Sequence, residues 1–117
     1  MDLVVPLTGI TADMRPQVGG KATALASTLA AGLQVPPGVC VTTRAYRRFV
    51  GQTGLEEKLA MEIHRKAAAD MRWEEMWDAS LRIAHLFRIT PIPDDLRRDL
   101  VRGLREFCAD RTLAVRS

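Results

Sequence analysis

The sequence predicts a helix-rich α+β fold with a small sheet built from a few short strands. Three short, mostly apolar segments indicate the strands, at residues 3–7, 39–42 and 113–116. Most of the remaining chain repeats its apolar residues with helical spacing, interrupted by glycine and proline. With 117 residues and 47% hydrophobic content, the chain can form one compact domain with its own core.

The first predicted elements flank a pair of glycines. Residues 3–7 form the first strand, and the turn-rich residues 8–16 form a loop. A helix then follows the pair Gly19–Gly20, because the next apolar residues recur every three or four positions on one face. Gly32 is expected just after the end of this helix, since glycine adopts the left-handed conformation without strain.

The second strand and a short helix come next. Residues 39–42 are mostly β-branched and follow a Pro-Pro-Gly turn, which predicts a strand. Thr43 can cap the following helix by accepting a hydrogen bond from a free N–H group. That helix is predicted at residues 44–50, with Gly51 as its end.

Three longer helices are predicted in the second half, at residues 55–68, 72–88 and 93–108. Trp73 and Trp77 share the predicted buried stripe of the middle helix, where a pair at this spacing is far more often core than a cofactor site. Residues 113–116 form the last predicted strand, in which the chain stops.

Composition excludes several classes of protein. The net charge is +3, from 17 basic and 14 acidic residues, and carboxylates intersperse the arginine-rich C-terminal helix. We therefore expect solvated or salt-bridged faces and no nucleic-acid partner. No signal peptide or membrane-spanning run is present, so we expect no membrane partner. The two distant cysteines, Cys40 and Cys108, are typical of a reduced, cytoplasmic chain.

The sequence Gly19-Gly20-Lys21 is the first candidate site. Glycines before a helix let backbone N–H groups approach a ligand, and the positive helix end favours an anion such as phosphate. Lys21 adds a mobile positive charge. The segment is not a Walker A loop, because Arg15 and Ala22 stand where that motif needs glycine and Ser or Thr. On the pattern alone, a flexible helix start with a solvated lysine is the preferred interpretation.

Arg116 is the second candidate. An arginine at the end of an apolar strand can bind a phosphate with two parallel hydrogen bonds. A charged strand end without a ligand is the simpler interpretation of the pattern. The histidines, His64 and His85, lack partners at ligand spacing, so both are expected at the surface. We expect no catalytic residue and no metal ligand within the chain.

Several segments taken together resemble a known family. The chain is similar to the N-terminal nucleotide-binding domain of phosphoenolpyruvate synthases and pyruvate phosphate dikinases, which rifampin phosphotransferases share. The matching segments are Val18-Gly19-Gly20-Lys21, residues 31–43, Ala45-Tyr46, Phe49, and Leu113-Ala114-Val115-Arg116-Ser117. Both ends of the chain match, while residues 52–110 match only as variable helices. Val39 departs from the phenylalanine usual in the family.

The resemblance implies an ATP-grasp-type fold whose nucleotide lies between two lobes. It implies that Lys21 and Arg116 contact the phosphates of ATP, with Gly19 and Gly20 in the same cofactor-binding site. Residues 1–117 would be the first lobe of such a domain. The resemblance places the adenine site, the Mg²⁺ ligands, the second lobe and the phosphohistidine domain beyond Ser117.

The function that the resemblance implies is phosphoryl transfer from ATP, through a catalytic histidine, to pyruvate. The remaining domains of the parent enzyme would be partners of this lobe, which we expect to bind nucleotide weakly or not at all by itself and to show no turnover. Three alternatives stay open at this point. They are the lobe of a rifampin-type antibiotic phosphotransferase, a stand-alone helical binding or adaptor domain, and a degenerate pseudo-enzyme remnant.

Overall fold

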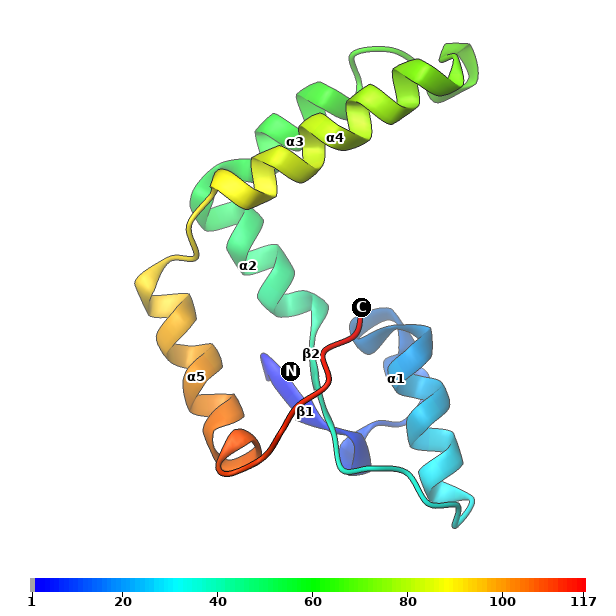
Figure 1. Cartoon of the computed structure of the whole chain (residues 1–117), viewed down its shortest axis with the longest axis vertical. Coiled ribbons are helices and arrows are strands. Elements are labelled where there is room, and N and C mark those ends of the chain that lie inside the picture. Colours follow the sequence, from blue (N-terminus) through cyan, green and yellow to red (C-terminus); the bar gives the residue numbers. More distant parts are fainter. Residues whose placement is uncertain (1) are drawn as a thin grey trace. The chain divides into compact units, whose positions relative to one another are not determined.

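The computed structural model describes residues 2–117, which form two compact units (Figure 1). One unit contains the chain up to Arg47 together with Asp94–Ser117, and the other contains Arg48–Pro93. The chain is mostly helical with one small antiparallel sheet, which confirms the predicted helix-rich α+β class.

The sheet of the first unit has two strands, β1 (Val4–Pro6) and β2 (Val39–Val41). They pair antiparallel with Val5 opposite Cys40. Backbone hydrogen bonds extend the pairing at both ends, from Leu7 N to Gly38 O at 2.9 Å and from Thr42 N to Leu3 O at 2.9 Å. The strands predicted at residues 3–7 and 39–42 are therefore confirmed.

The core of the first unit lies between this sheet and the first long helix, α1 (Arg15–Ala30). Two short 3-10 helices, Leu7–Gly9 and Ala12–Met14, replace most of the predicted loop and bring the chain back toward the sheet. The buried side chains of this core are Leu7, Ile10, Ala22 and Ala26.

Helix α1 ends as the sequence predicts. Gly32 has a φ of 83°, and its N–H donates to Leu29 O at 3.0 Å. The N–H of Leu33 donates to Thr28 O at 3.3 Å. These two bonds form a Schellman motif, in which a left-handed glycine satisfies the last carbonyl groups of a helix.

Helix α2 (Thr43–Thr53) differs from its prediction at both ends. It begins at Thr43, so this residue is not the cap; Thr42 precedes the helix, and its buried hydroxyl donates to Asp2 O at 2.9 Å. The helix continues through Gly51, whose missing side chain does not prevent helical backbone. It ends at Thr53, and Gly54, which has a φ of 71°, separates it from the next helix.

Helix α5 (Asp94–Cys108) returns the chain to the first unit and packs on β1. Leu96 is fully buried, and a Cβ placed on Gly103 would lie 3.0 Å from Val4 Cγ2, so the glycine permits a close approach. The residues that follow α5 form no strand, and the strand predicted at 113–116 is wrong. Val115 is 93% exposed and no described strand pairs with the segment, although a strand needs a neighbour for its hydrogen bonds.

The second unit is a helical hairpin of α3 (Leu55–Ile63) and α4 (Trp73–Ile89), which lie side by side (Figure 1). A short 3-10 helix, Ala68–Asp70, lies between them, so α3 ends earlier than the predicted residue 68. The core of the hairpin contains Val50, Leu55 and Leu59, with Phe49 and Phe87 stacked at 6.2 Å between ring centroids.

The predicted buried stripe of α4 is wrong for its two tryptophans, although Phe87, at the end of the same stripe, packs in the core as predicted. Ala79, Ile83 and Leu86 face inward, whereas Trp73 is 68% and Trp77 is 60% exposed. At about 100° per residue, the two tryptophans lie roughly 120–160° around the helix from that inward face. Among residues 2–117, no helix has the length and hydrophobicity that crossing a membrane requires.

Candidate functional site

The glycine pair interrupts α1 near its start. Gly19 has a φ of 83° and a ψ of 170°, a backbone conformation that only glycine adopts readily. The first helical turn therefore lies before Gly19, and a second helical segment begins at Gly20. The sequence predicted that the helix starts after the glycine pair. In the structure α1 already starts at Arg15 and is interrupted at Gly19, and only its longer segment follows the interruption. The Thr23 hydroxyl donates to Gly19 O at 2.6 Å and supports the turn.

A strand of the sheet holds this turn in place through a hydrogen bond. The thiol of Cys40 in β2 donates to the carbonyl oxygen of Val18 at 3.4 Å. Burial raises the pKa of the Cys40 thiol, so the group remains a neutral donor at neutral pH. Ala22, in the first turn of the second helical segment, is buried against the core. The start of this helical segment is thus held by packing as well as by hydrogen bonds.

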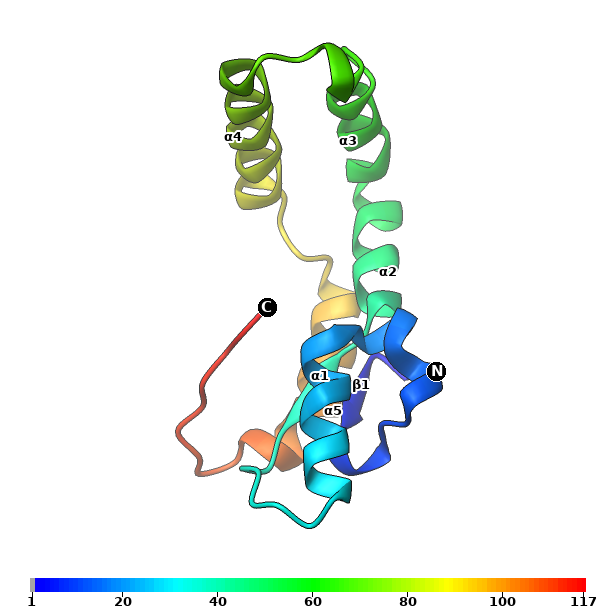
Figure 2. The same ribbon diagram turned by 90° about the vertical axis from the view of Figure 1, so that its right-hand side faces the viewer.

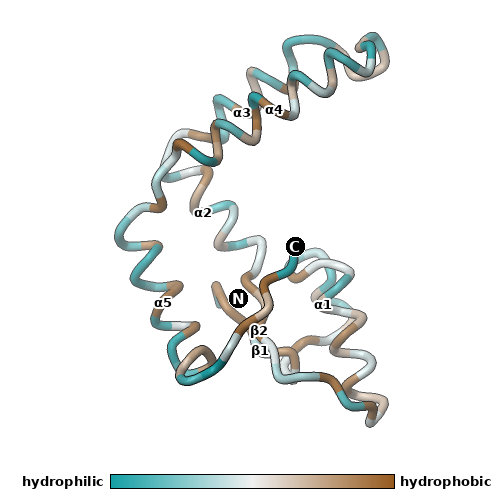
Figure 3. Tube along the Cα trace, in the orientation of Figure 1, coloured by the Kyte–Doolittle hydropathy of each residue, from teal (hydrophilic) through white to brown (hydrophobic). Residues whose placement is uncertain are grey.

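Lys21 reaches the C-terminal segment of the chain. Its Nζ donates a hydrogen bond to the carbonyl oxygen of Ser117, although the two residues are 96 positions apart. The segment is extended and irregular (Figure 2), and its apolar residues lead to a polar end (Figure 3). Arg116 precedes Ser117 and is exposed. The structure therefore brings the backbone beside Arg116 to the lysine of the glycine turn.

Arg15 is a candidate site residue that the sequence interpretation did not single out. An ideal Cβ on Gly20 would lie 3.5 Å from Nη2 of Arg15 and 3.9 Å from its Nε. The guanidinium group therefore lies along the backbone of Gly20, next to Lys21. The internal break at Gly19 makes this approach possible, and no periodic pattern in the sequence signals such a break.

The electrostatics of this region favour an anion. Within residues 2–117, the side chains of Arg15 and Arg116 have no ion-pair partner, and the amine of Lys21 donates a hydrogen bond to an oxygen of Ser117. The same part of the chain contains no group of three His, Cys, Asp or Glu side chains that could hold a metal ion. The arrangement can bind phosphate oxygens, but it has no metal-ligand set of its own.

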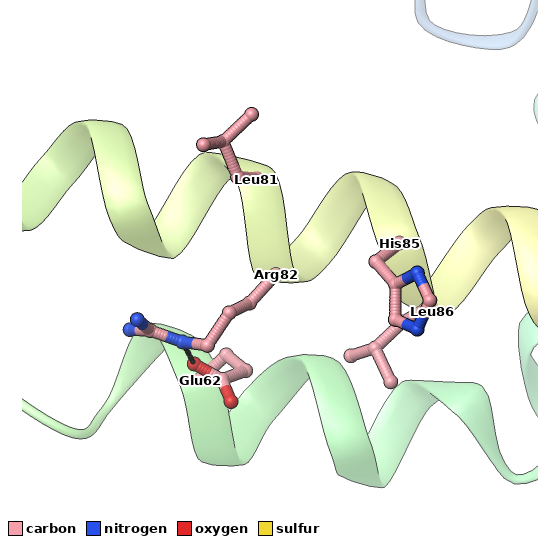
Figure 4. Close-up of a pocket in the computed structure, with 5 residues that line it drawn as sticks. All are labelled: Glu62, Leu81, Arg82, His85 and Leu86. Carbon is pink, nitrogen blue, oxygen red and sulfur yellow. Dashed lines mark hydrogen bonds and ion pairs between the residues drawn. The ribbon is translucent and has the colours of Figure 1, made fainter.

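The second unit contains a shallow groove of about 380 Å³ between α3 and α4 (Figure 4). Arg82 Nε donates to Glu62 at 2.9 Å, and Arg65 pairs with the other carboxylate oxygen at 3.1 Å. The hydrogen bond from Arg82 and the charge of Arg65 hold the pKa of Glu62 below its usual value. His85 lines the groove but is exposed, as is His64, which confirms the predicted surface positions. Because its charged groups pair with one another, we assign this groove a role in holding α3 against α4.

Arginine side chains of α5 line a second open groove, which has a volume of about 400 Å³. Acidic side chains alternate with the basic ones along this helix, and Arg102 lies 3.7 Å from Asp99. The face is therefore mixed in charge, as predicted. Its basic residues are Arg97, Arg98, Arg102 and Arg105.

The fold is helix-rich α+β, and its glycine turn with the exposed cations Arg15 and Lys21 is a candidate anion site. Residues 15–117 match the family described as the pyruvate phosphate dikinase AMP/ATP-binding domain. The chain belongs to this family, and the resemblance stated from the sequence is confirmed.

Three curated relatives illustrate the range of the family. A phosphoenolpyruvate synthase of Aeropyrum pernix is 41% identical over 89% of this chain and 13% of its own length. A probable phosphoenolpyruvate synthase of Methanocaldococcus jannaschii is 34% identical over 85% of this chain and 9% of its own. A rifampicin phosphotransferase of a Streptomyces species is 30% identical over 98% of this chain and 13% of its own. The chain thus spans about an eighth or less of each relative.

Proposed function

We propose that this chain forms the phosphate-binding part of the ATP site of a larger phosphotransferase. In this role Lys21 and Arg116 bind the phosphates, and the backbone of Gly19 and Gly20 approaches them closely. The observation that carries the proposal is the contact between Lys21 Nζ and the carbonyl oxygen of Ser117, next to Arg116. The backbone next to Arg116, which is distant in the sequence, thereby lies at the lysine of the glycine turn. The match to an AMP/ATP-binding family supports the same assignment.

The chemistry of this part is electrostatic. Phosphoryl transfer spreads negative charge over the phosphate oxygens, and fixed cations stabilise that charge more strongly in the transition state. Lys21 provides a mobile ammonium group, whereas the Arg116 guanidinium can make two parallel hydrogen bonds. The site holds and orients the phosphate chain. It contains no nucleophile and no general base, so the transfer itself needs groups from elsewhere in the protein.

Mg²⁺ is part of the proposed reaction, because metal ions neutralise charge between nucleotide phosphates. The residues of this chain do not fit the ion: within residues 2–117, no cluster of three suitable side chains exists. We therefore assign the Mg²⁺ ligands to the remaining domains and assign no step at the ion to this chain.

The proposed parent enzyme transfers phosphoryl from ATP to pyruvate through a catalytic histidine in another domain. Residues 1–117 are then the first lobe of an ATP-grasp-type domain in a cytoplasmic protein. Its partners are ATP and the other domains of the same protein, with no nucleic acid or membrane. The names and lengths of the phosphoenolpyruvate synthase relatives support this proposal.

A rifampicin phosphotransferase is the second candidate, supported by a relative of that name that matches 98% of this chain. The two candidates share the lobe and differ in the acceptor. Assaying the whole parent protein with ATP and either pyruvate or rifampicin separates them. Phosphorylation of rifampicin with no reaction of pyruvate would overturn the first candidate.

Chemical-shift mapping tests the site in this chain. Because we expect this lobe to bind nucleotide weakly at most by itself, ATP is added to the isotope-labelled protein at high concentration. The amide signals of residues 19–22 and of Arg116 should then shift. Adenosine at the same concentration should leave them unchanged, because it lacks the phosphates. The proposal fails if ATP shifts other residues and leaves these unchanged.

A further inference from the structure

We propose that Arg15 is a third cationic ligand of the phosphate chain, beside Lys21 and Arg116. This inference rests on the proposed function and extends it by one residue. Arg15 lies in the turn of α1 that precedes the break at Gly19, while Lys21 lies in the turn that follows it. The break therefore places the two cations on either side of the same glycine pair.

The position of the guanidinium group supports this role. It lies along Gly20, with Nη2 3.5 Å and Nε 3.9 Å from where a Cβ would be. The missing side chain at Gly20 leaves room for the guanidinium group beside this exposed residue, so a phosphate that approaches the Gly20 amide could contact the guanidinium group as well. A planar guanidinium group has several N–H donors and can bind two phosphate oxygens at once.

The lack of an acidic partner for the Arg15 side chain also supports this role. Within residues 2–117, the side chain of Arg15 has no ion pair or hydrogen bond. Asp13, its nearest acidic neighbour in sequence, accepts a hydrogen bond from the Thr11 hydroxyl instead. The exposed cations Arg15 and Lys21 thus lie on either side of one glycine turn. Because like charges repel each other, a bound polyanion would stabilise this arrangement.

Titration of variants of the full chain tests the inference. Arg15→Gln removes the charge, Arg15→Lys keeps the charge but loses the planar fork, and Arg98→Gln is the control for an exposed arginine elsewhere. Binding is followed by chemical shifts with two probes, ATP and inorganic tripolyphosphate, at matched ionic strength. We expect Arg15→Gln to weaken binding of both probes about tenfold, as for one lost charge-assisted hydrogen bond. Arg15→Lys should lose less, and Arg98→Gln should bind as the wild type does.

The outcomes separate the inference from the proposed function when Lys21→Gln is titrated in parallel. If Lys21→Gln loses affinity while Arg15→Gln binds both probes as the wild type does, Arg15 is not a ligand and the proposed function stands. If neither variant loses affinity, or if the wild type shows no shift with either probe, both proposals fall. An equal loss in Arg15→Gln and Arg98→Gln would reduce the effect to net charge and would also overturn the inference.

Discussion

The thiol of Cys40 lies 3.4 Å from the carbonyl oxygen of Val18, the residue that precedes the backbone break at Gly19. Cys40 belongs to β2 and Val18 to the first turn of α1, so this hydrogen bond joins the sheet to the glycine turn. A turn that must place backbone and cations around a phosphate benefits from such support, because a preorganised site does not have to order itself on binding.

Replacing Cys40 with valine is expected to flatten the pH dependence of stability in the alkaline range. Burial raises the pKa of the thiol above its ordinary value of 9.0 in the folded chain. The unfolded chain therefore loses the proton first as pH rises, and the stability that the neutral thiol contributes at neutral pH is lost. Urea unfolding from neutral to alkaline pH should show a steeper loss in the wild type than in Cys40→Val. Parallel curves would contradict this assignment.

The ion pairs of Glu62 should support the hairpin of α3 and α4 at neutral pH. The hydrogen bond from Arg82, with a smaller contribution from Arg65, lowers the pKa of Glu62 from its ordinary 4.5. A lowered pKa stabilises the fold above that value, and the stability is lost as pH falls through the folded-state pKa. We expect Glu62→Gln to melt earlier than the wild type at neutral pH. The difference, measured by circular dichroism, should disappear in acid; a difference that persists there would argue against the ion pairs.

Two glycines near the C-terminal end of α2 should have opposite effects on stability when each is replaced by alanine. Gly54 has a φ of 71°, whereas Gly51 lies inside the helix, and a Cβ at either would meet no atom within 4 Å. Gly54→Ala should therefore cost about 1 kcal/mol of unfolding free energy through backbone strain alone. Gly51→Ala should raise the unfolding free energy by up to about 1 kcal/mol, because alanine is the better helix former. Denaturant titration measures both, and destabilisation by Gly51→Ala would mean that α2 ends where the sequence predicts.

Leu55 is the strongest test of the core of the second unit. It is 1% exposed, while Met61 on the same helix is 74% exposed. Leu55→Ala should lower the unfolding free energy by about 2–5 kcal/mol, since it removes buried contacts and leaves a cavity. Met61→Ala, the matched control, should change it by no more than about 0.5 kcal/mol. Similar effects of the two substitutions would contradict the packing of the hairpin.

Local sequence signals predicted the elements that depend on local chemistry. The strands at 3–7 and 39–42 are bounded by turn residues, and Gly32 ends α1 because its left-handed conformation is a local requirement. Elements that depend on distant partners were predicted less well. Residues 113–116 have strand-like composition, but no described strand pairs with them.

Helix faces and the site also show that features set by distant contacts were harder to predict than features set by local chemistry. Trp73 and Trp77 have core-like spacing, yet tertiary packing places Ala79 inward instead, and no periodicity could decide between those faces. In the site, the sequence pattern marked the glycine pair, Lys21 and Arg116 as candidates, and the resemblance implied their phosphate-binding roles, which stay predictions. Arg15 could not be predicted because its position depends on the φ of Gly19.

The affinity of Lys21 and Arg116 variants for ATP tests the central claim most directly. Lys21→Gln and Arg116→Gln are each expected to weaken ATP binding about tenfold in a chemical-shift titration, since each removes a charged phosphate contact. Lys58→Gln, which removes an exposed lysine from α3, should bind ATP as the wild type does. Unchanged ATP affinity in both the Lys21 and the Arg116 variant would contradict the proposed phosphate site.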